Sequence, residues 1–194
     1  ECKVPVIIYV NKMDRDDAYF DKCVDSVRDR LHTTPLPLQM PIGMAETFKG
    51  VIDLLKMKAY IPEDDLGKII DEVEIPEEYR EEAEKRRNQL IETIVETDDA
   101  LLEKYFEGEE ISIQELNKAI RAATISKKVT PMLCGSSYKN KGVQNLLDAM
   151  VEYLPSPLDI EAIKGINPET GKEETREADV NAPLDYAGEK GRIN

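Results

Sequence analysis

The sequence predicts an α/β fold in which a parallel sheet with covering helices is interrupted by an inserted α+β subdomain with a small antiparallel sheet. Two short apolar runs, residues 4–10 and 129–134, are each followed by a polar loop and then by an amphipathic helix pattern. This order of strand, loop and helix is typical of α/β domains with parallel strands. The intervening residues 34–128 have a different texture, which indicates an insertion.

The first unit covers residues 1–33. Its apolar run, Val-Pro-Val-Ile-Ile-Tyr-Val, is rich in β-branched residues, as expected of a parallel strand that is covered on both faces. The helix pattern that follows places apolar residues on one face between Phe20 and Leu31. Asp16 or Asp17 is expected to cap the start of this helix.

The insertion, residues 34–128, begins with strand patterns. Leu36, Leu38, Met40 and Ile42 alternate with prolines and Gln39, so we expect a single strand at the edge of a sheet. Further extended stretches at residues 48–60 and 68–75 complete the predicted antiparallel sheet.

Helix patterns occupy the rest of the insertion. Pro76 suits the first turn of a helix that runs to about Thr97. Gly108 is expected to end a second, shorter helix. Ser112 and Glu115 match a capping box, which predicts the start of a third helix.

At residue 129 the chain returns to the parallel sheet, and the second unit covers residues 129–154. A strand is expected at 129–134 and a glycine- and serine-rich loop at 135–142. The next helix pattern has its apolar residues on one face: Val143, Leu146, Leu147, Met150, Val151 and Leu154. We expect residues 155–184 to form a linker and the start of another domain, whereas residues 185–194 remain unassigned.

The composition is that of a globular protein, with 41% hydrophobic and 34% charged residues. No signal peptide or transmembrane run is visible, so a cytoplasmic location is expected. The three cysteines and the single histidine, His32, show no spacing typical of metal ligands or of a disulfide framework. We therefore expect no metal site.

The net charge of −14 is concentrated in one region. Residues 62–110 contain 19 Asp and Glu against 6 Lys and Arg, a local balance of −13. Such a surface repels a phosphate backbone, so direct binding of the insertion to nucleic acid is not expected. A partner with a basic patch fits this charge, and solvated helix faces without a partner are the alternative.

The polar tetrad Asn11-Lys12-Met13-Asp14 follows the first strand, where ligands bind in open α/β sheets. The Asp14 carboxylate could accept two hydrogen bonds from the imino and amino groups of guanine, a donor pair that adenine lacks. Lys12 could lay its aliphatic stem along a base, and the Asn11 amide could tie neighbouring loops together. An ordinary turn after a strand is the alternative for this tetrad alone.

The tetrad and the second loop, Gly135-Ser136-Ser137 with Lys139-Asn140-Lys141-Gly142, together resemble the base-recognition motifs of translational GTPases. The resemblance is closest to the bacterial elongation factor G family and extends over residues 3–184. It includes the stretches at residues 41–43, 48–53, 56–59, 75–79 and 153–159, and the insertion resembles that family's extra subdomain.

This resemblance implies a guanine site built from two loops. Asp14 would bind the base edge, Lys12 would cover its face, and Asn11 would help to hold the second loop. The backbone amide of Ser137, at a position where the family usually has Ala, would receive the guanine carbonyl oxygen. Ser136 would support the Asp14 loop, with Gly135 as a supporting loop residue.

The phosphate-binding loop, the magnesium ligands and the catalytic histidine of the family do not occur in this sequence. We therefore expect an internal fragment of the GTPase, inactive alone, with no catalytic residues and no tight binding of nucleotide. The complete protein would bind GTP or GDP, and Mg²⁺ with it.

The implied function is that of an elongation factor G fragment, whose parent promotes ribosomal translocation. Its expected partners are the ribosome and, through the acidic insertion, the ribosomal stalk protein. No membrane partner is expected, and the chain should be a monomer. The alternatives are a protein-interaction module that binds no nucleotide by itself and another translational GTPase, such as a release-factor or ribosome-protection relative.

Overall fold

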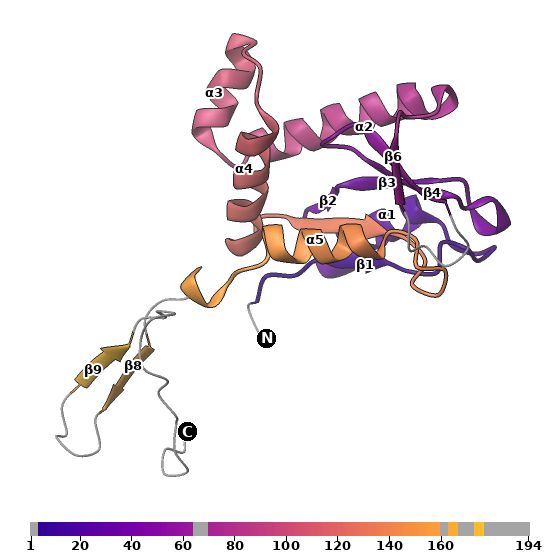
Figure 1. Ribbon diagram of the computed structural model, residues 1–194. Coiled ribbons are helices and arrows are strands. Elements are labelled where there is room, and N and C mark those ends of the chain that lie inside the picture. Colours follow the sequence, from indigo (N-terminus) through magenta and orange to yellow (C-terminus); the bar gives the residue numbers. More distant parts are fainter. Residues whose placement is uncertain (1–3, 64–69, 160–162, 167–172, 177–194) are drawn as a thin grey trace. The chain divides into compact units, whose positions relative to one another are not determined.

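The computed structural model describes residues 4–63, 70–159, 163–166 and 173–176 (Figure 1). The chain divides into two compact units, residues 1–154 and 155–194. Within the second unit, strands β8 (Ile163–Ile166) and β9 (Glu173–Arg176) pair antiparallel after a short 3₁₀ helix, η2 (Pro157–Asp159). The predicted tail at residues 185–194 and most of the predicted linker lie outside the described residues.

A three-stranded parallel sheet has the order β1-β7-β2 (Figure 1). These strands are β1 (Ile8–Val10), β7 (Thr130–Cys134) and β2 (Pro35–Pro37), and every residue of β7 is buried. The predicted first strand is shorter than its apolar run, because Val4 and Val6 are 61% and 49% exposed and lie outside the paired segment. The predicted α/β class, with a parallel sheet, helices and a separate antiparallel sheet, is confirmed.

The antiparallel sheet has the order β3-β4-β5-β6. Its strands are β3 (Gln39–Ile42), β4 (Gly50–Asp53), β5 (Lys58–Pro62) and β6 (Ile70–Val73). The stretch predicted as one extended segment at residues 48–60 is therefore two strands joined by a turn. Their pairing places Ile52 opposite Ala59, and both residues are fully buried.

The single strand predicted from Leu36 to Ile42 is wrong, because the chain changes sheet at Leu38. The Leu38 amide donates to the Met132 carbonyl of β7 at 2.9 Å, while its own carbonyl accepts from the Leu54 amide at 3.0 Å. The residues before Leu38 pair in the parallel sheet and those after it in the antiparallel sheet. The predicted position at the edge of a sheet is confirmed for both strands, since β2 is an edge strand of the parallel sheet and β3 is an edge strand of the antiparallel sheet.

Helix α1 (Phe20–Leu31) precedes β2, and α2 (Glu77–Val95), α3 (Asp99–Glu107) and α4 (Ile113–Ile125) follow β6. Gly108 ends α3 in the left-handed conformation, and Ser112 and Glu115 form the predicted capping box. The predicted cap of α1 by Asp16 or Asp17 is wrong. The N-cap is Tyr19, which makes no side-chain capping bond, because the turn at residues 12–18 delays the first helical residue. Among the described helices, none has the length and apolar character that crossing a membrane requires.

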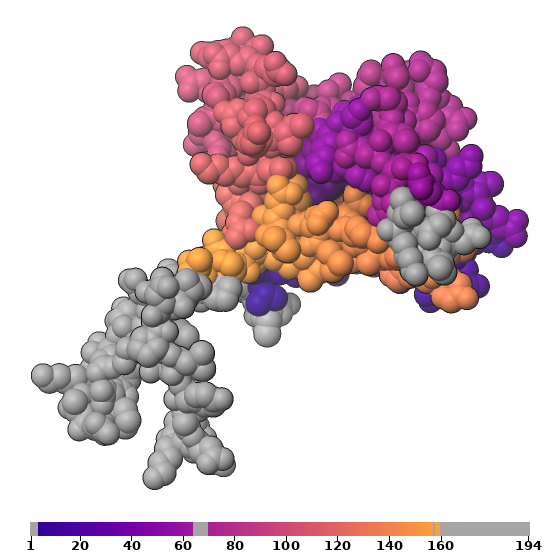
Figure 2. Space-filling view, in the orientation of Figure 1, coloured from indigo at the N-terminus to yellow at the C-terminus, as the bar shows by residue number. Residues whose placement is uncertain are grey.

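Helix α5 (Val143–Tyr153) buries only part of the predicted face, since Leu146 packs against the core while other members of that face are exposed. Ala149 and Tyr153 are buried, whereas Leu147, Met150 and Val151 are 55%, 44% and 83% exposed. Packing against α4 fixes this rotation, since the Tyr153 hydroxyl donates to the Asn117 side chain at 2.9 Å. The orange surface of α5 is accordingly open in Figure 2.

Two buried clusters hold the first unit together. The larger one extends through both sheets and the helices of the insertion, for example from Leu133 of β7 to Ile52 of β4 and Leu116 of α4. The smaller one includes Met13 and Phe48, which lie far apart in sequence. The insertion therefore shares its apolar core with the parallel sheet.

Replacing Ser112 with Ala should lower the free energy of unfolding by about 1 kcal/mol, because the Glu115 amide loses its acceptor. A urea titration followed by circular dichroism measures this loss. Ser26→Ala in α1 is the matched control and should change stability by less than about 0.5 kcal/mol. Equal stability of the Ser112 variant and the wild type would contradict the capping role.

Candidate functional site

The parallel sheet brings the two predicted loops together. β1 and β7 are neighbours, with Val10 opposite Cys134 at their last residues. The Gly135 amide donates to the Val10 carbonyl at 3.0 Å, which extends the pairing to the start of the second loop. Because both strands run in the same direction, residues 11–15 and 135–142 both follow the carboxyl ends of their strands, on the same side of the sheet.

A hydrogen bond joins the two loops. Asn11 Oδ1 accepts from the Ser137 amide at 2.9 Å and from the Lys12 amide at 2.8 Å. The first of these bonds connects residues that are 126 positions apart. It also engages the amide that the resemblance assigns to a guanine carbonyl, so a bound base would compete with Asn11 for the Ser137 donor.

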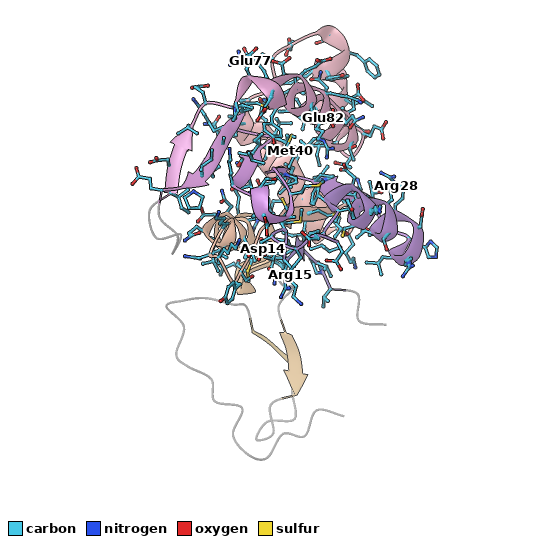
Figure 3. The ribbon with its side chains drawn as sticks, turned by 90° about the vertical axis from the view of Figure 1, so that its right-hand side faces the viewer. Asp14, Arg15, Arg28, Met40, Glu77 and Glu82 are labelled. Carbon is cyan, nitrogen blue, oxygen red and sulfur yellow. The ribbon has the colours of Figure 1, made fainter. Side chains whose placement is uncertain are left out.

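The surroundings of Asp14 lower the pKa of its carboxyl group. A hydrogen bond from the Ser136 side chain is the main cause that lowers the pKa of Asp14, and the nearby Lys139 and Arg15 charges lower the pKa further. Ser136 is 1% exposed, and its hydroxyl also accepts from the Lys139 amide at 3.3 Å. Asp14 is partly exposed and lies beside Arg15 in Figure 3, so its carboxylate can be reached by a further hydrogen-bond donor.

Lys12 and Gly135 occupy constrained backbone positions. Lys12 is exposed and has a φ of 64°, in the left-handed region. A Cβ at Gly135 would lie 2.2 Å from the Lys141 carbonyl oxygen and 2.3 Å from the Tyr9 hydroxyl. Only glycine therefore lets the second loop turn this close to β1.

The sequence did not indicate two residues that support the loops. Met13, the apolar member of the tetrad, is 1% exposed, and its amide donates to the Gly135 carbonyl at 3.1 Å. The Tyr9 hydroxyl donates to the Lys141 carbonyl at 3.2 Å, and burial raises the pKa of Tyr9 to about 12. The available signals were an apolar residue within a polar tetrad and a hydroxyl within an apolar strand.

Asn11 and Lys12 are also among the residues that line a hollow of about 650 Å³ beside β1 and α1. Asp14, Ser136 and Ser137 do not line this hollow. Among the described residues 4–63 and 70–159, no cluster of three or more His, Cys, Asp or Glu side chains suits a metal ion. The chemistry that the two loops offer is therefore hydrogen bonding to a polar, planar group beside an aliphatic lysine stem.

Comparison with known proteins assigns the family. Residues 1–156 match the family model described as the elongation factor Tu GTP binding domain. The chain belongs to this family. The expected relationship to translational GTPases is thereby confirmed at the level of the GTP-binding domain.

A solved structure has a similar fold. It is the crystal structure of a protein from Thermus thermophilus, with a TM-score of 0.71 and 30% sequence identity. The similarity covers 88% of this chain and 26% of that chain. The chain thus spans about a quarter of the length of this relative.

Gly135→Ala should lower the free energy of unfolding by about 1–3 kcal/mol, because the added methyl group meets a carbonyl and a hydroxyl at sub-van der Waals distances. Thermal unfolding measures the loss. Gly108→Ala is the control: its φ is 74°, but nothing lies within 4 Å of the new Cβ, so a cost of about 1 kcal/mol is expected. A smaller loss for Gly135→Ala than for Gly108→Ala would contradict the close approach.

Proposed function

We propose that this chain is part of a translational GTPase of the elongation factor G type and that its two loops select guanine. The observation that carries the proposal is the bond between Asn11 Oδ1 and the Ser137 amide, which joins the two loops into one site. Membership in the elongation factor Tu GTP binding domain family supports the same nucleotide class.

The loops would read the base through its edge and its face. The two oxygens of Asp14 accept from the guanine imino and amino groups, in contacts worth roughly 1.5–3 kcal/mol each. Lys12 covers the face of the base, and the Ser137 amide shares its proton between Asn11 and the guanine carbonyl. The Ser136 hydrogen bond lowers the pKa of Asp14 and so favours its charged, accepting form. The carboxylate thus provides the discrimination against adenine.

We propose that other parts of the complete protein bind the phosphates and Mg²⁺, because this sequence contains no glycine-rich loop that ends in Gly-Lys-Ser or Gly-Lys-Thr. Residues 1–33 and 129–154 would then be parts of one GTPase domain, interrupted by the insertion 34–128, whose first strand, β2, pairs in the parallel sheet of that domain. Residues 155–184 would lead into a following domain. This chain alone should bind GDP weakly, since charged phosphate contacts are the strongest at such sites.

The insertion would dock on the ribosomal stalk protein and would contribute to function on the ribosome. Exposed carboxylates lie along α2, among them Glu77, Glu78, Glu81 and Glu84. Figure 3 shows Glu77 at the opposite end of this view from Asp14, with Met40 between them. The acidic surface and the base-reading loops are thus separate regions of the molecule, and a lysine-rich partner suits the former.

Asp14→Asn in the full-length protein should weaken GDP binding by about 100-fold and favour xanthosine diphosphate instead. An amide can donate to the carbonyl that replaces the amino group of guanine in xanthine. Titration calorimetry with the two nucleotides measures the exchange of preference.

Asp16→Asn is the matched control for this exchange, because Asp16 is an exposed carboxylate just beyond the tetrad. It should keep the wild-type preference for GDP. Unchanged guanine selectivity in the Asp14 variant would refute the role given to that carboxylate.

Charge reversal at Glu81 and Glu84 should weaken stimulation of GTP hydrolysis by the stalk protein about tenfold without changing GDP affinity. Glu82 is less suitable for this test, since its carboxylate accepts from Arg86 Nε at 2.7 Å. The matched control reverses the exposed carboxylates Asp16 and Asp29, which should leave stimulation unchanged. An equal loss in both double variants would argue against a specific docking surface on α2.

A further inference from the structure

Residues 43–48, within the connection between β3 and β4, contact both loops of the candidate site. We call it the brace segment, and it contains the 3₁₀ helix η1 (Ala45–Thr47). The Ala45 amide donates to the Met13 carbonyl of the first loop at 3.1 Å. The Lys141 ammonium group of the second loop donates to the Phe48 carbonyl at 3.1 Å. One short segment of the insertion therefore supports both loops.

Buried apolar packing reinforces these two polar contacts. Phe48 is 2% exposed and Met13 is 1% exposed, and both belong to the smaller buried cluster. Cys134, the last residue of β7, belongs to the same cluster. The brace segment thus packs against residues adjoining both loops, and any separation of the loops would expose apolar surface.

Left-handed backbone conformations occur in the brace segment and in both loops. Ala45, Lys12 and Asn140 have φ values of 51°, 64° and 51°, in the region that residues with a side chain rarely adopt. Such conformations persist where the surrounding structure enforces them, and they concentrate at functional sites. One of the three lies in the brace segment and one in each loop.

The brace segment is also tied to helix α2. The Gly43 amide donates to the Tyr79 hydroxyl oxygen at 3.1 Å. Gly43 has a φ of 77°, and a Cβ there would lie 2.2 Å from the Thr47 carbonyl oxygen, so this turn requires glycine. Tyr79 therefore links the acidic helix to the connection that supports both loops.

We propose that the brace segment sets the spacing of the two loops, with Lys141 and Tyr79 as positioning residues for the guanine base. This inference rests on the proposed function of the site. When the hydrogen bond of Lys141 to Phe48 or that of Gly43 to Tyr79 is lost, the loops separate more readily, and the guanine nucleotide dissociates faster. The insertion thereby acts on the base-reading loops through two named hydrogen bonds, without itself contacting the base.

The test replaces Lys141 with Met in the full-length protein, which removes the ammonium group and keeps an unbranched stem. The GDP dissociation rate, measured by displacement of a fluorescent GDP analogue, should rise about tenfold. Lys141→Arg restores a donor and should return the rate to within about twofold of wild type, and Tyr79→Phe should raise it about threefold. Lys49→Met removes a neighbouring exposed lysine and should leave the rate unchanged.

Amide hydrogen exchange in the nucleotide-free protein separates this inference from the proposed function. The Met13 and Ser137 amides should exchange faster in Lys141→Met and Tyr79→Phe than in wild type or Lys49→Met. Unchanged exchange in both variants, unchanged GDP dissociation, or failure of Lys141→Arg to restore the rate would each overturn the positioning roles. Amide exchange could become faster in the two variants although the wild type does not prefer GDP over ADP. In that case the proposed function and the assignment to guanine fail, but the support of the two loops by the brace segment stands.

Discussion

The parallel pairing of β1 with β7 is the constraint on which the candidate site depends. It places Val10 opposite Cys134, and the Gly135 amide continues the ladder by donating to Val10. Asn11 then reaches Ser137 across 126 residues of sequence. A shift of the register by one residue would turn the buried side chains to the other face and break this bond. The residues between β1 and β7 must therefore fold so that β7 pairs with β1 in this register.

Local contacts, and not the overall charge, determine the state of Asp14. A net charge of −14 by itself disfavours ionisation of a further carboxyl group. The pKa of Asp14 is nevertheless lowered, first by the Ser136 hydrogen bond and then by the Lys139 and Arg15 charges. Short-range hydrogen bonds outweigh distant surface charges, which water and salt screen. The acidic surface of α2 and the anionic carboxylate of Asp14 can thus coexist in one domain.

Elements with local causes could be predicted from the sequence. The capping box at Ser112 and the glycine that ends α3 depend on residues within one helical turn, and both predictions hold. The change of sheet at Leu38 could not be predicted, because the same alternation continues on both sides of that residue. The rotation of α5 depends on Asn117 of another helix, which no periodicity within α5 reveals. The support given by Met13 and Tyr9 likewise depends on a loop that lies far along the chain.

The most direct measurement is a crystal structure of the full-length protein with GDP. Both Asp14 carboxylate oxygens should lie about 2.7–2.9 Å from the guanine imino and amino nitrogens, with the Lys12 stem against the base. The loops after β1 and β7 should also remain joined between Asn11 and Ser137. A guanine base bound away from Asp14, or bound with the two loops apart, would contradict the account.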